Sequence, residues 1–111
     1  MANVVISPKA EKDLEQIGDY IARQSKSLKI ALNTIQKIKT RINDLKNFPL
    51  IGKPLSSIIT VDTDYRFLGC GSYLMFYRYH NDDALIDRIL HGRQDYVSIL
   101  LGDLTNENDV Q

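Results

Sequence analysis

The sequence has a single cysteine, Cys70, so no disulfide can form within the chain. A protein without disulfides suits a reducing compartment, and we expect a cytoplasmic location. The first residues lack a basic segment followed by a long apolar one, so we expect no secretory signal peptide. No stretch approaches the roughly 20 apolar residues of a membrane-spanning helix, so we expect no membrane partner.

The common signatures of cofactor sites are also missing. No group of Cys, His, Asp or Glu has the spacing of metal ligands, and no glycine-rich phosphate loop follows a predicted strand. Cys70 lies between two glycines with no evident pair of His and acid around it, which favours a small packed residue over a nucleophile. We therefore expect neither a metal nor any other cofactor.

The net charge is zero, but the charges are unevenly distributed. Between Arg23 and Lys53 there are eight Lys or Arg against one acid, whereas from Asp62 onward four Arg stand against nine Asp or Glu. The basic segment is either a surface for an acidic partner or a solvated helix face. A sequence pI near 6.7 provides little general attraction to nucleic acid.

At 111 residues the chain is long enough for one domain with a modest core. Residues 3–6 predict a short strand. Ser7 and Pro8 predict the cap and first residue of a helix that runs to about Gln24. Its apolar stripe consists of Ala10, Leu14, Ile17 and Ile21.

A second helix follows the break at residues 25–27. Its apolar residues recur every three or four positions, which predicts a helical hairpin packed on a sheet. The same stripe could form a coiled-coil dimer, although it spans fewer than three or four heptads. The stripe consists of Leu28, Ala31, Ile35, Ile38, Ile42 and Leu45.

Two prolines and a glycine in residues 48–54 predict a loop without regular structure. Residues 56–60 are ambiguous between an extended piece and a turn. Three strands are then predicted at 65–68, 73–79 and 85–90, separated by turns with Gly or Asn-Asp sequences. Residues 97–101 predict a short closing turn of helix, followed by a frayed polar tail.

This order of elements predicts a two-layer α+β domain: an N-terminal strand, a helical hairpin, then a three-stranded antiparallel meander (β-α-α-β-β-β). The helices should cover one face of the sheet, which leaves the other face for function. Within residues 73–79 both the odd and the even positions carry large apolar side chains, so either set could face the helices.

Five motifs together resemble the RelE/ParE superfamily, the toxins of bacterial type II toxin–antitoxin pairs. The resemblance covers residues 3–101 and implies one toxin domain, 1–101, followed by an acidic tail, 102–111. The closing motif is nearer the ParE-like branch, with Gln94 in place of a second arginine. The motifs are Ser7–Leu14, Phe48-Pro49 with Gly52-Lys53-Pro54, Tyr65-Arg66, Tyr73–Arg78 and Arg88–Tyr96.

The resemblance implies two possible activities. RelE-like members cut mRNA on the ribosome, and the matching candidates here are Arg66, Arg93 and His91 as catalytic groups. Other positions of that catalytic set are occupied by residues that cannot do this chemistry: Leu68, Leu74 and Ile99. The set is depleted, so the chain is an endoribonuclease only in this alternative.

ParE-like members instead poison DNA gyrase without acting as nucleases. We therefore expect a ParE-like toxin that arrests growth by binding a protein target, most plausibly gyrase, and that a cognate antitoxin neutralises. The alternatives are an mRNA interferase and a non-toxic binding module. The expected target-binding residues are Arg66, Arg88, Arg93 and Tyr96, and the expected antitoxin-binding residues are Lys37 and Arg41.

Each cationic candidate also has a structural interpretation. Arg66, Arg78 and Arg88 could each pair with an acid on a neighbouring strand, such as Asp64 or Asp87. His91 could be a hydrogen-bonded residue at a strand end.

Overall fold

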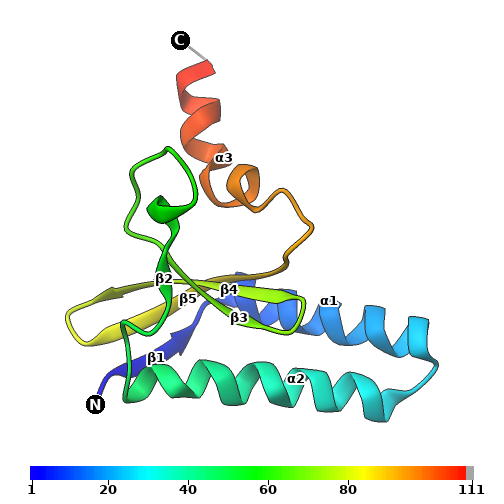
Figure 1. Ribbon diagram of the computed structural model, residues 1–111. Coiled ribbons are helices and arrows are strands. Elements are labelled where there is room, and N and C mark those ends of the chain that lie inside the picture. Colours follow the sequence, from blue (N-terminus) through cyan, green and yellow to red (C-terminus); the bar gives the residue numbers. More distant parts are fainter. Residues whose placement is uncertain (110–111) are drawn as a thin grey trace.

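The computed structural model describes the backbone of residues 1–109 and the side chains of residues 1–102. A five-stranded sheet has the order β1-β5-β4-β3-β2, with a helical hairpin on one face (Figure 1). The strands are β1 (Asn3–Ile6), β2 (Lys53–Pro54), β3 (Arg66–Cys70), β4 (Tyr73–His80) and β5 (Asp83–His91). The helices are α1 (Pro8–Ser25), α2 (Leu28–Asn43) and α3 (Tyr96–Asp109), with single 3-10 turns at η1 (Asp44–Lys46) and η2 (Leu55–Ser57).

Local signals set the ends of the helical hairpin. The Ser7 hydroxyl accepts the Ala10 N–H at 3.0 Å, and Pro8 is the first helical residue, as predicted. α1 ends where Lys26 takes a left-handed conformation, with φ of 55°. Ser27 then caps α2 by accepting the Ile30 N–H at 3.2 Å.

The predicted meander is confirmed, and β1 joins it as a parallel neighbour of β5. Asn81 and Asp82 both have positive φ, 51° and 65°, which turns β4 tightly back into β5. β1 ends opposite Ile86, so the last residues of β5 have no strand on that side. A bulge between Phe76 and Tyr77 shifts the register of β4 against β5 at that point.

Both faces of the sheet carry a hydrophobic cluster. The odd residues of β4, among them Met75 and Tyr77, face the helices with Ile38, whereas Phe76 points to the other side. The expectation that the opposite face is left free for function is therefore wrong. Since the even positions of β4 also carry large apolar side chains, that face needs cover, which comes from Leu55, Ile59, Tyr65, Tyr96 and Leu100.

Two predicted boundaries are wrong in the loops. Residues 53–54 form a two-residue strand, because Pro54 lies at the sheet edge where its missing N–H is not needed. β3 continues through Gly69 to Cys70, and the turn falls at Gly71, whose φ of 58° suits glycine.

The C-terminal helix is longer than the predicted single turn. α3 runs from Tyr96 to Asp109, so residues 102–109 are helical where a frayed tail was expected. A single glycine, Gly102, weakens a helix by only about 1 kcal/mol and does not end one that is already formed. Residues 110–111 of the expected tail lie outside the described residues.

The predicted stripe of α2 is internal, which excludes the coiled-coil dimer as its explanation. Ile38 is 0% exposed and Ile42 is 2% exposed within this one chain. Leu28 departs from the prediction, since it is 69% exposed at the tip of the hairpin. The tip of the hairpin, where α1 turns into α2, extends beyond the sheet (Figure 1).

Candidate functional site

Arg88, an expected target-binding residue, joins β5 to α1. Its Nε and Nη2 donate to the two carboxylate oxygens of Asp13 at 2.8 and 2.9 Å. Asp13 is only 7% exposed and also accepts the Ile89 N–H at 2.9 Å. The bidentate hydrogen bonds to Asp13 raise the pKa of Arg88 above its ordinary value. Arg88 is thus held in a structural ion pair, with an acid on a helix and not on a neighbouring strand.

The geometry of this ion pair follows from the early end of β1. From Ile86 onward, backbone groups on the open edge of β5 form their hydrogen bonds with Ser7 and with Asp13 of α1. The Ser7 N–H donates to the Ile86 carbonyl at 2.9 Å, and the Ser7 hydroxyl donates to the Asp87 carbonyl at 2.9 Å. The Asp13 carboxylate, six residues after Ser7 on α1, completes the edge by accepting the Ile89 N–H.

Arg78 forms a second cluster with Tyr65 and Asp87. Its Nε and Nη2 donate to Asp87 Oδ2 at 3.1 and 2.8 Å, the neighbour-strand pairing that the sequence suggested. Its guanidinium lies 4.7 Å from the centre of the Tyr65 ring, and the Tyr65 hydroxyl donates to Asp87 at 2.8 Å. Burial first, and then this hydrogen bond, raise the pKa of Tyr65 to about 12.

Among the described side chains Arg66 pairs with no acid, and it holds the loop of residues 47–52, here called the 47–52 loop. Its Nη1 donates to the Gly52 carbonyl at 2.8 Å. Beside it, the fully buried Tyr77 accepts the Gly52 N–H at 3.0 Å and donates its hydroxyl to the Pro49 carbonyl at 2.7 Å. Burial raises the pKa of Tyr77. Arg66 therefore positions a loop in this structure.

His91 and Arg93 lie in the turn that follows β5. His91 Nδ1 accepts the Arg93 N–H at 3.0 Å, and the His91 ring meets the Tyr73 ring edge-on at 5.4 Å. The Arg93 side chain is exposed and has no ion pair among the described side chains. A groove of about 540 Å³ opens beside them, bounded also by Tyr20 and Gln94.

Tyr96 does not lie with these groups. Its ring packs on Phe76 with 5.2 Å between ring centres, as part of the cluster on the opposite sheet face. An aromatic residue in that cluster supports α3 on the sheet. Tyr96 was expected to bind the target, but its side chain is half-buried in this cluster.

The three candidate catalytic residues do not converge. Arg66 pairs in register with Tyr77, whereas His91 pairs with Tyr73, four residues away along β4. At about 3.3 Å per residue this is a separation of about 13 Å along the strand alone. One scissile phosphate cannot contact both ends of such a set.

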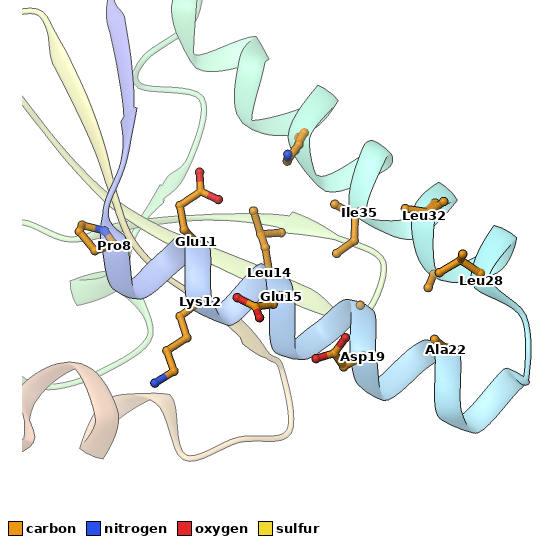
Figure 2. A pocket seen from close by; sticks show the side chains of 13 residues that line it. Pro8, Glu11, Lys12, Leu14, Glu15, Asp19, Ala22, Leu28, Leu32 and Ile35 are labelled. Carbon is orange, nitrogen blue, oxygen red and sulfur yellow. The ribbon is translucent and has the colours of Figure 1, made fainter.

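A second groove lies between α1 and α2, with a volume of about 730 Å³ (Figure 2). Its apolar lining includes Leu28 and Leu32, which are 69% and 59% exposed. The α1 side carries three carboxylates one helical turn apart together with Lys12, and the α2 side carries Lys39. The carboxylates belong to Glu11, Glu15 and Asp19.

A pattern in the sequence of α1 indicates this groove. Acids spaced by four residues beside an apolar stripe mark one face of a helix. The residues expected to bind antitoxin are elsewhere on α2: Lys37 is exposed, and Arg41 pairs with Asp44 at 2.9 Å. Neither of them lines the groove.

No cluster of three or more His, Cys, Asp or Glu among the described residues could hold a metal ion. No helix in this part of the chain is long and apolar enough to cross a membrane.

The fold matches solved toxin–antitoxin structures. The chromosomal ParDE toxin–antitoxin system from P. aeruginosa has a TM-score of 0.70 at 22% identity, covering 82% of this chain and 96% of that chain. The RelBE2 toxin–antitoxin complex from Mycobacterium tuberculosis has a TM-score of 0.55 at 21% identity, covering 81% and 90%. At such identities these likenesses establish the RelE/ParE toxin fold.

The sequence itself assigns the family. Residues 4–96 match the model described as the ParE toxin of the type II toxin–antitoxin system, parDE. The match spans most of the chain, so the protein belongs to the ParE toxin family of type II toxin–antitoxin systems. The resemblance drawn from the motifs is thereby confirmed. Among curated proteins no sequence matches the chain significantly.

Proposed function

We propose that this toxin arrests bacterial growth by binding a protein target, DNA gyrase, and that a cognate antitoxin neutralises it. The observation that carries the proposal is the placement of the cationic groups. Arg66 is hydrogen-bonded to a loop carbonyl, Arg88 is paired with Asp13, and Arg93 has no ion pair among the described side chains. A nuclease needs acid–base and charge-stabilising groups around one phosphate, and this arrangement favours a toxin that acts by binding.

The groove between α1 and α2 is the surface that fits an antitoxin best. Its apolar floor suits the apolar stripe of an amphipathic helix (Figure 2). Its acidic rim on α1 favours a helix that carries Lys or Arg one turn apart on the facing side. This proposal differs from the acidic antitoxin segment that the basic residues of α2 suggested, because the groove is lined by the acids of α1.

Induced expression in bacteria tests the target. We expect growth arrest with gyrase-dependent changes in plasmid supercoiling, while mRNA 5′ ends remain those of uninduced cells. Cuts at regular codon positions in mRNA would instead identify an mRNA interferase. Growth at the uninduced rate would identify a non-toxic binding module and overturn the proposal.

A further inference from the structure

The 47–52 loop exposes three large apolar side chains within four residues. Phe48 is 63% exposed, Leu50 is 57% exposed and Ile51 is 43% exposed. Burying apolar side chains of this size is favourable, and these three positions leave much of that burial unused. A cluster of this kind on a loop is typical of a surface that a partner covers.

The exposure does not come from a loosely held loop. Tyr77, which is 0% exposed, bonds to both Gly52 and Pro49, and Arg66 bonds to the Gly52 carbonyl. The Ile51 N–H donates to the Phe48 carbonyl at 3.1 Å, which closes the loop on itself. The loop is therefore ordered before any partner arrives, so binding would cost little conformational entropy.

Two lysines flank the apolar cluster. Lys46 precedes the loop and Lys53 follows it, and both are exposed without an ion pair among the described side chains. The nearby acid, Asp44, is already paired with Arg41. The complementary surface on a partner is an apolar pocket bordered by Asp or Glu carboxylates.

The geometry points to the 47–52 loop as the element that docks this toxin on its protein target. Phe48, Leu50 and Ile51 insert into an apolar pocket of the target, and the flanking lysines meet carboxylates at the rim. Arg66 acts as a positioning residue that presents the loop. This inference rests on the proposed function, in which the target is a protein, and it assigns the target a surface distinct from the antitoxin groove.

Two double variants with matched exposure test the assignment. Phe48→Ser with Leu50→Ser removes the centre of the loop cluster, at 63% and 57% exposure. Leu28→Ser with Leu32→Ser removes apolar surface from the groove, at 69% and 59% exposure. Since all four side chains are exposed, both variants should unfold at the temperature of the wild type, which thermal unfolding checks.

We expect the loop variant to lose growth arrest and at least tenfold in affinity for purified gyrase, while its affinity for the cognate antitoxin stays within twofold. The groove variant should show the reverse. Growth arrest by the loop variant at the wild-type level would overturn the inference, and so would its loss of antitoxin binding. A third outcome is that the wild type arrests growth without binding gyrase and the loop variant does not arrest growth. That result would reject gyrase as the target and support the loop as the docking element.

The charge reversal Lys46→Glu with Lys53→Glu tests the chemistry of the partner. We expect slower association with the target and a loss of its salt dependence, because the lysines would steer an acidic rim. Unchanged association and salt dependence would overturn the acidic rim. A wild-type toxin without any growth effect would overturn the proposed function, and this inference with it.

Discussion

Gly52 is the glycine at which an added Cβ would have the least room. A Cβ there would lie 2.6 Å from the Tyr77 ring and hydroxyl and 2.8 Å from the Phe67 carbonyl oxygen. The carbonyl belongs to β3, which pairs with β2 and β4, so it cannot move without disturbing the sheet. The Phe-Pro and Gly-Lys-Pro motifs therefore have a structural meaning: they close a loop against a buried tyrosine.

We expect Gly52→Ala to lower the free energy of unfolding by about 1–3 kcal/mol, because the added methyl group overpacks this contact. Urea unfolding followed by circular dichroism measures the change. Gly18→Ala is the control, since its Cβ would lie 3.6 Å from Ile35 in ordinary contact. Within a helix that substitution should raise stability by about 0.5–1 kcal/mol. Equal stabilities of wild type and Gly52→Ala would mean that the loop is not clamped.

Asp13 is the other residue with a decisive role in the fold. Asp13→Asn keeps the shape but removes the charge that accepts from Arg88 and Ile89. We expect a loss of about 2–3 kcal/mol in the free energy of unfolding, the range for a hydrogen-bonded charged group. The double variant with Arg88→Met should lose less than the sum of the single changes. Additive losses would show that the two side chains do not interact.

At the scale of elements, α2 is held by its contact with the sheet. Ile38 is 0% exposed among residues from the helices and from β4 and β5. We expect Ile38→Ala to cost about 2–5 kcal/mol through the cavity that it leaves. Leu28→Ala, at 69% exposure on the same stripe, should change stability by less than about 0.5 kcal/mol. Similar costs at both positions would contradict the packing of α2 described here.

The two faces of the helical hairpin allow the antitoxin proposals to be compared. Glu15→Lys with Asp19→Lys reverses two charges on the groove rim. We expect slower association with the antitoxin and a flattened salt dependence, because the carboxylates attract a basic helix. Lys37→Glu with Arg41→Glu is the control on the outer face of α2. If only the control variant slows association, the acidic antitoxin segment suggested by the sequence is correct and the groove is not its site.

For the molecule as a whole, tyrosines with raised pKa values make the stability depend on pH in the alkaline range. The pKa of Tyr65 is raised to about 12 by burial and by its bond to Asp87, and burial also raises the pKa values of Tyr73 and Tyr77. The folded state therefore keeps protons that the unfolded state loses near pH 10. The contribution of these tyrosines is complete below pH 10 and falls as the pH rises toward 12.

We expect the free energy of unfolding to decline steadily between pH 10 and about 12, and less steeply in Tyr65→Phe. Urea unfolding at each pH measures it, and tyrosinate absorbance follows the titration of the folded state. In that titration the variant should lack the tyrosine whose pKa is raised to about 12. A decline as steep in the variant as in the wild type would mean that the Tyr65 hydroxyl is not held by Asp87.

Local patterns in the sequence were enough to predict much of this protein. The cap at Ser7, the repeat along α2 and the turn at Asn81 and Asp82 each depend on residues close together in the chain. Together with the ordered motifs they predicted the α+β order of elements and the toxin superfamily. The partners of the charged side chains in the sheet were harder to predict, because an arginine in a strand can pair with many different acids.

Only the tertiary structure decided where the candidate residues act. It paired Arg88 with Asp13, 75 residues earlier, and turned Arg66 toward a loop. It also placed Tyr96 in the cluster that covers the second sheet face. The acids of α1 came to line a groove between the two helices. The physical reason is range: helix caps and turns are made by neighbours in sequence, whereas ion pairs, strand faces and grooves form between segments whose register no local pattern specifies.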